Sequence, residues 1–239
     1  MFYNIKLSIL FCVNNLVGKI VFCDSLPNGS GFVNWAYMNW KRLVIEGILN
    51  DQGASEFITK MLSNEHRCGE ETKGTPPCTT ACYKCLLSFR NMPYHGLIDW
   101  RLGLSYLRVL HDPKYSCGLR SDDYQYGELV DWRSLVITEA QMFSELFGFD
   151  YLEHKDTGFP LITRNINGNN HALLVRHPLW DKNNPTGLFN DLVCHAISEG
   201  FTPHVIDSFN LMRRKSWCYE EFEKDIREMS GAVTHMDLS

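Results

Sequence analysis

At 239 residues, the chain is long enough to bury a substantial core, either as one large domain or as two modest ones. Its hydrophobic share of 44% and charged share of 21% are ordinary globular values, which exclude a disordered or low-complexity chain. The net charge of −5 argues against a surface that binds nucleic acid all over, but it leaves room for a local basic patch.

The first elements that we expect are two strands over residues 3–13 and 18–24. The apolar run near the start could also form the core of a signal peptide, but Ile5, Leu7 and Ile9 alternate with polar residues, which favours a strand. No stretch approaches the ~20 apolar residues that a membrane-spanning helix needs. We therefore expect a cytoplasmic protein with no membrane segment.

Helical periodicity then predicts helices over residues 32–48, 54–62 and 97–110. The intervening segment 64–95 has little periodicity, so something other than a hydrophobic core must order it. Residues 112–132 are rich in Asp, Gly, Ser and Tyr, which favours a boundary between two halves, 1–115 and 116–239.

The second half has a mixed α/β pattern. We predict a helix over 136–147 that ends at Gly148, and a hairpin of strands 159–164 and 171–176 around Asn167-Gly168. The predicted order of elements ends with three more: a helix capped by Thr186 and closed by Gly200, a strand over 204–207, and a polar helix over 217–229. The fold class is therefore α/β in the broad, α+β sense.

Nine cysteines are distributed unevenly along the chain. Cys12, Cys23 and Cys194 lie in apolar surroundings and are expected to be buried. Four others fall between positions 68 and 85. This clustering favours a metal site in a reducing compartment over a set of disulfides.

The cluster Cys78-x3-Cys82-x2-Cys85 places three thiols within eight residues. Thiolates suit Zn²⁺, which accepts a tetrahedron of soft donors without a ligand-field preference. Cys68 is the first choice for the fourth ligand, followed by His66, His95 and Cys117. We expect a structural zinc site, whose metal contributes directly to the folding of this apolar-poor segment.

The spacing C-x3-C-x2-C also occurs in radical S-adenosylmethionine enzymes, where three thiolates hold a [4Fe–4S] cluster. Those enzymes place the motif after the first strand of a long β/α barrel. Here the motif follows helices, and Lys84 stands where an aromatic residue is usual. This metal-dependent enzyme remains the alternative.

Two motifs stand out, one in residues 20–33 and one in residues 78–102. Together they resemble the four-cysteine domain of unknown function at the C-terminal end of certain DEAD/DEAH-box helicases, including the mitomycin-repair helicase and subunits of DISARM-type phage defence. The motifs are the segment 20–33, a strand followed by an Asp-Ser-Leu-Pro-Asn-Gly turn, and the run Cys78-x3-Cys82-Tyr83-Lys84-Cys85-Leu86-Leu87-Ser88-Phe89-Arg90-Asn91, followed by His95 and Leu97-Ile98-Asp99-Trp100-Arg101-Leu102.

This resemblance covers about residues 18–110 and implies a zinc module that is attached to, or partnered with, a DNA-translocating helicase in DNA repair or phage defence. Asn28 and Ser30 depart from the family's usual Pro-Gly-Gly-Ala-Gly turn. The chain has neither G-x4-G-K-[ST] nor a D-E-x-H box, so it carries no motor of its own. It would serve a helicase as a separate subunit or as a detached C-terminal piece.

The element order of the second half also matches the restriction-endonuclease core, in which an acidic helix precedes a hairpin that holds Mg²⁺. Glu139 could be the helix acid, but neither hairpin strand carries a carboxylate. A degenerate core without activity, or an unrelated α/β domain, fits better than an active nuclease, and we assign no catalytic residue.

Five basic residues are candidates for contact with nucleic acid. Arg213, Arg214 and Lys215 form a run followed by two aromatic residues, and Arg164 and Arg176 lie on the hairpin. A solvated helix entry and a structural cluster are the alternative interpretations. The cysteine cluster predicts a zinc-binding module, and the resemblance implies a non-catalytic accessory role in which the module docks onto a partner, onto DNA, or onto both.

Overall fold

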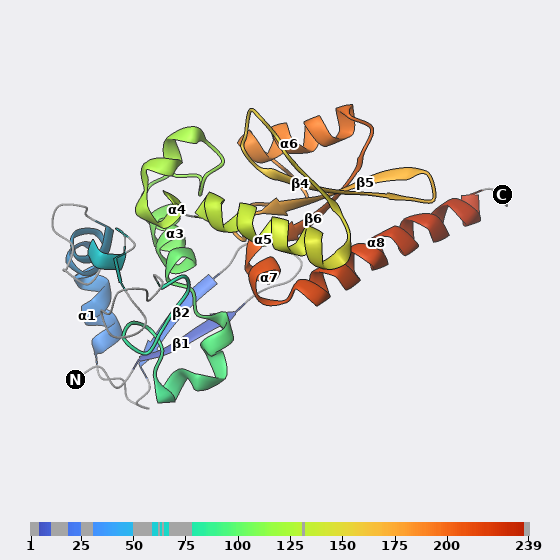
Figure 1. Cartoon of the computed structure of the whole chain (residues 1–239). Coiled ribbons are helices and arrows are strands. Elements are labelled where there is room, and N and C mark those ends of the chain that lie inside the picture. Colours follow the sequence, from blue (N-terminus) through green and yellow to red (C-terminus); the bar gives the residue numbers. More distant parts are fainter. Residues whose placement is uncertain are drawn as a thin grey trace. The chain divides into compact units, whose positions relative to one another are not determined.

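The computed structural model describes residues 5–10, 19–24, 31–49, 59–61, 63, 65–66, 78–130 and 132–236 (Figure 1). Contacts between Cα atoms divide the chain into two units, residues 1–66 and 67–239. The fold is mixed α/β, as the sequence predicts. The expected module boundary at residue 115 stays a prediction.

The first unit contains a two-stranded antiparallel ladder of β1 (Ile5–Leu10) and β2 (Lys19–Asp24), in register from Ile5↔Asp24 to Leu10↔Lys19. The single helix predicted over 32–48 is instead two pieces, α1 (Phe32–Met38) and the π-helical η1 (Lys41–Leu49). The carbonyl of Trp35, where α1 ends, accepts from the backbone N–H of Asn39 at 3.0 Å and from its side-chain amide at 2.8 Å. Of the helix predicted over 54–62, residues 59–61 are helical, and the remainder lies outside the described residues.

The second unit begins with the cysteine-rich segment and the 3-10 helix η2 (Phe89–Leu97), and continues into α3 (Trp100–His111). The polar stretch after α3 holds the 3-10 helix η3 (Ser121–Gln125) and α4 (Gly127–Val130), which the sequence did not predict. The buried Asp123 carboxylate organises this stretch, because it accepts hydrogen bonds from the backbone N–H groups of Ser116 (3.1 Å) and Gly118 (3.0 Å).

A four-stranded mixed sheet forms the centre of the second unit. Its strands are β3 (Asp150–Glu153), β4 (Pro160–Ile166), β5 (Asn169–Arg176) and β6 (Thr202–Asp207), in spatial order β3-β4-β5-β6. The pairs β3–β4 and β4–β5 are antiparallel, and β6 runs parallel to β5. As predicted, Asn167-Gly168 turns the β4–β5 hairpin, and both residues have positive φ (52° and 86°), as a type I′ turn requires.

Helices cover both faces of this sheet: α6 (Gly187–Ser198) lies on one face, and α5 (Trp132–Phe147), α7 (Ser208–Arg213) and α8 (Lys215–Met236) lie on the other (Figure 1). Because both faces are covered, consecutive residues of β4 and β5 are buried. The helices α5 and α6 end at Gly148 and Gly200 as predicted. Thr186 is the residue before α6, but its side chain makes no capping hydrogen bond, so that detail of the prediction is wrong.

Candidate metal centre

The cysteine-rich loop folds into a tight turn around Cys82 and Cys85. The carbonyl of Cys82 accepts hydrogen bonds from the N–H groups of Cys85 and Leu87, each at 3.0 Å. The N–H of Cys82 donates to the Cys85 Sγ atom at 2.9 Å. Such a turn can bring the sulfurs of Cys82 and Cys85 close enough to bind one ion. The Cys82 N–H would also stabilise negative charge on a Cys85 thiolate.

Four potential metal donors meet at this turn. One ligand atom from each of His66, Cys78, Cys82 and Cys85 lies within 4.8 Å of all the others. Cys78 and Cys82 are buried, and His66 and Cys85 are partly buried. The cluster could therefore hold a metal ion.

The spacing of the sulfurs fits a metal better than a disulfide. The Sγ atoms of Cys78 and Cys85 are 3.9 Å apart, whereas a disulfide bond is about 2.05 Å long. Two thiolates bound to one tetrahedral ion at about 2.3 Å would lie about 3.8 Å apart, which is the edge of the tetrahedron. Three sulfurs and one imidazole nitrogen are also a donor set that structural zinc sites use.

Hydrogen bonds join the start of α3 to the cysteine-rich loop. The indole N–H of Trp100 donates to the carbonyl of Cys78 at 2.9 Å, and the backbone N–H of Trp100 donates to the carbonyl of Thr80 at 3.0 Å. The guanidinium of Arg101 donates to the carbonyl of Thr79. These contacts fix the backbone that carries Cys78, which is the first thiol of the loop.

Asp99 fixes the start of α3 in turn. Its carboxylate caps the helix by accepting from the N–H groups of Arg101 (3.1 Å) and Leu102 (3.2 Å), and it pairs with the guanidinium of Arg213 on α7 at 3.0 Å. An Asp directly before an apolar-periodic run is a recognisable capping signal, although it did not enter the sequence prediction as a site residue. The metal loop is thus tied through α3 to the helices around the sheet.

The structure brings some of the predicted metal ligands together and not others. Cys78, Cys82 and Cys85 lie together, and His66, the second choice for the fourth position, joins them. Cys68, the first choice, lies outside the described residues, so its role as a ligand stays a prediction. His95 is hydrogen-bonded within η2, and Cys117 belongs to the core of the second unit, where burial raises the pKa of its thiol to about 12.

The predicted burial of three further cysteines has a mixed outcome. Cys194 is exposed on α6, where its Sγ lies 3.8 Å from the Asn190 side chain, so the expectation that it is buried is wrong. Cys12 and the side chain of Cys23 lie outside the described structure.

The basic run at 213–215 makes contacts within the fold. Arg213 pairs with Asp99, and Arg214 lies over the Trp217 ring with its guanidinium carbon 4.9 Å from the centroid. Lys215 forms an ion pair with Glu139 of α5. A role of these cations in binding nucleic acid stays a prediction.

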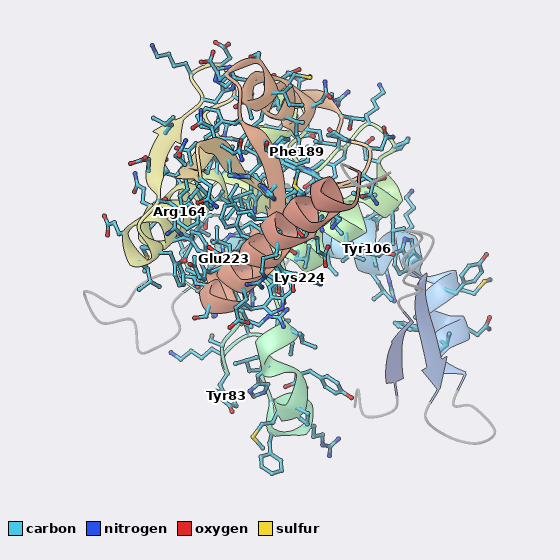
Figure 2. All side chains as sticks on the ribbon, turned by 90° about the vertical axis from the view of Figure 1, so that its right-hand side faces the viewer. Tyr83, Tyr106, Arg164, Phe189, Glu223 and Lys224 are labelled. Carbon is cyan, nitrogen blue, oxygen red and sulfur yellow. The ribbon has the colours of Figure 1, made fainter. Side chains whose placement is uncertain are left out.

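The two hairpin arginines also contact neighbouring groups. Arg164 faces Glu223 of α8 at 3.7 Å (Figure 2). Arg176 donates from Nη1 to the carbonyls of His177, Pro178 and Trp180, and burial lowers the pKa of its guanidinium. Each of these contacts supports the sheet, and the predicted contact with nucleic acid is left untested.

No protein-family model matches this chain, and no match was found among curated proteins or solved structures. In the part of the chain that the structure describes, no helix is long and apolar enough to cross a lipid bilayer.

Proposed function

We propose that this chain is a non-catalytic accessory module in which zinc orders the cysteine-rich loop. The observation that carries the proposal is the convergence of His66, Cys78, Cys82 and Cys85. Four protein donors complete a tetrahedron and leave no open coordination position, which is the property of structural rather than catalytic zinc. A bound ion would cross-link the loop through its four ligands. The side chains of the loop would form the surface that it presents.

The same count of donors disfavours the iron–sulfur alternative. A radical S-adenosylmethionine enzyme uses three thiolates and leaves one iron of its [4Fe–4S] cluster open for the substrate. Here an imidazole lies with the three thiols, and among the described residues the next element after the thiols is a 3-10 helix. Zinc is therefore the metal that we propose.

The proposed partner is a DEAD/DEAH-box helicase, and the support for it is the resemblance of residues 18–110 to the four-cysteine domain of such helicases. The chain has no nucleotide-binding loop of its own, so it would act beside a motor in DNA repair or phage defence. Recovery of the tagged chain from its native host together with a helicase would support this assignment. Recovery without any motor protein after mild cross-linking would contradict it.

A degenerate nuclease core is the second proposal, and it concerns residues 132–207. Along the chain, α5, the β4–β5 hairpin, α6 and β6 follow one another in the predicted order, and the structure adds β3 before the hairpin. We propose that it is inactive, because β4 and β5 supply no carboxylate to hold Mg²⁺ and Glu139 is paired with Lys215. Mg²⁺-dependent DNA cleavage that disappears in Glu139→Ala would contradict this proposal.

The zinc proposal is tested by Cys82→Ser beside Cys194→Ser, an exposed cysteine on α6 that serves as the matched control. We expect Cys82→Ser to lose most of its bound zinc and to melt at a lower temperature, because one ligand of four is gone. The control should match the parent chain in both measurements. Unchanged zinc content and unchanged melting in Cys82→Ser would refute the structural-zinc proposal.

A further inference from the structure

The segment after the metal loop has its polar side chains turned inward and its apolar side chains turned outward. None of the residues of η2 is buried. Six large apolar side chains of this segment are between 42% and 82% exposed. We call them the 83–97 face: Tyr83, Leu86, Phe89, Met92, Tyr94 and Leu97. In Figure 2, η2 projects from the rest of the second unit with Tyr83 beside it.

Polar contacts hold this arrangement in place. The Asn91 side chain accepts from the N–H of Ser88 at 2.8 Å and donates to the carbonyl of Leu86 at 2.8 Å. The His95 Nε2 atom lies 2.9 Å from Asn91 Oδ1 and 3.0 Å from the Ser88 carbonyl. The His95 ring also meets the edge of Tyr83, with centroids 5.4 Å apart. The polar groups therefore serve as the internal support, and the apolar side chains are left for a ligand.

The charge of the segment identifies the ligand class. Residues 78–98 contain no Asp or Glu, although the whole chain has a net charge of −5. They do contain Lys84 and Arg90, both exposed. A zinc centre with three thiolates and one imidazole carries one net negative charge, which these two cations more than offset. Two copies of the face would place like charges against each other, which disfavours self-association.

We propose that the 83–97 face binds single-stranded nucleic acid. Exposed aromatic rings interleaved with cations are the composition of surfaces that stack unpaired bases and neutralise phosphates. Phe89, Tyr94 and Tyr83 supply the rings, and Lys84 and Arg90 supply the charge. This inference deepens the proposed function and relies on it in one respect, because zinc fixes the loop from which the face projects.

The test measures binding of a fluorescein-labelled oligothymidine of about 15 nucleotides by fluorescence anisotropy. Phe89→Ala and Tyr94→Ala should each weaken binding about tenfold, as expected for the loss of one stacked base. Tyr37→Ala is the matched control, because Tyr37 is a ring of similar exposure (76%) outside the face. It should bind like the parent chain.

The salt dependence gives a second, independent readout. Replacing both Lys84 and Arg90 with Ala should lower the slope of log K against log salt by about 1.4, that is, about 0.7 per lost phosphate contact. Oligothymidine binding that Phe89→Ala and Tyr94→Ala leave unchanged would overturn the inference. So would concentration-dependent dimerisation in sedimentation that Phe89→Ala abolishes, because the face would then be a protein interface.

Zinc is measured in every variant, so that the two proposals can fail separately. Variants that retain zinc and bind oligothymidine like the parent chain refute the nucleic-acid inference alone. A parent chain that contains no zinc refutes the proposed function, whatever its binding to oligothymidine.

Discussion

The second unit contains two regions that are ordered in opposite ways. In the sheet, residues His171 to Val175 of β5 are all buried, and Phe143 of α5 and Phe189 of α6 belong to the same buried core. In the cysteine-rich segment, η2 has no buried residue, and the described contacts are hydrogen bonds, the ring contact of Tyr83 with His95, and potential metal ligands. Hydrophobic burial stabilises the first region, whereas local polar contacts and a metal would stabilise the second.

Because the two regions are stabilised differently, they should respond to different perturbations. Substitutions in the sheet core should lower the global free energy of unfolding and leave metal binding intact. Changes to the ligands or to the η2 hydrogen bonds should loosen the loop and leave the sheet protected. The helix α3 connects the regions, because its first turn holds the loop and its last turns pack on α4.

The largest effect is expected from Phe159→Ala. Phe159 is fully buried, and its ring lies 5.9 Å from that of Trp132 and 5.6 Å from that of Trp180, between centroids. Truncation should lower the free energy of unfolding by about 3–5 kcal/mol through lost burial and an incompletely filled cavity. Denaturant unfolding measures this change, and zinc content under native conditions should stay at the parent value. Loss of zinc in the folded variant would show that the two regions are not separately stabilised.

Breaking the buried ion pair of α3 and α4 should have the next largest effect. Arg108 Nε lies 2.6 Å from Glu128 Oε1, with side-chain exposures of 8% and 0%. Arg108→Met leaves the Glu128 carboxylate buried without its partner and should cost about 3 kcal/mol in denaturant unfolding. The double variant Arg108→Met/Glu128→Leu should recover much of that loss. A double variant less stable than the single one would contradict this account of the pair.

Acidification should destabilise the sheet side through His177. Burial and the nearby Arg176 cation lower the pKa of His177 from 6.5 to about 3. Between these two pH values the unfolded chain binds the proton and the folded chain does not, so stability is full above about pH 6.5 and falls as the pH is lowered towards 3. One such group contributes up to about 1.4 kcal/mol per pH unit. His177→Asn should remove that part of the slope in urea titrations, and an unaltered slope would exclude His177 as its source.

The smallest global effect is expected from Asn91→Ala, which removes three hydrogen bonds inside the loop and η2. Because these groups are not in the core, the free energy of global unfolding should change by no more than about 1 kcal/mol. Amide hydrogen exchange should accelerate over 86–97 while β4 and β5 keep their protection. Faster exchange in the strands as well would show that the loop supports the sheet.

Much of the second unit could be predicted from local signals. The spacing of apolar residues predicts α3, α5 and α6. Asn167-Gly168 predicts the hairpin, because the positive φ that the turn needs at two successive positions is a local requirement. β3 was missed because it is a four-residue edge strand, with one half-buried and three exposed residues, and no apolar alternation marks it. The helix α7 was missed because its six residues are too few to show a period.

The errors about burial have geometric causes. Cys194 was expected in the core because its neighbours are apolar, but it lies about 200° around α6 from the buried Leu192, at 100° per residue. The Arg108–Glu128 pair joins residues 20 positions apart, and no local pattern indicates which charges will be buried together.

The sequence predicts the three thiols of the candidate metal site more readily than it predicts the fourth ligand. Spacing alone brings Cys78, Cys82 and Cys85 together, because a short turn leaves them little freedom. The fourth donor must come from outside residues 78–85, and its identity depends on the path of the chain. Cys68 was the first choice because it lies ten residues upstream in the same aperiodic loop. The described structure brings His66 to the cluster, and Cys68 lies outside the described residues.

The most direct test of the central claim is the metal content of the parent chain, measured by mass spectrometry together with an absorption spectrum after purification without chelator. The account predicts one zinc ion per chain in a colourless protein, and loss of that ion in Cys85→Ser. Iron with acid-labile sulfide and a brown colour, or a folded protein that binds no metal, would contradict it.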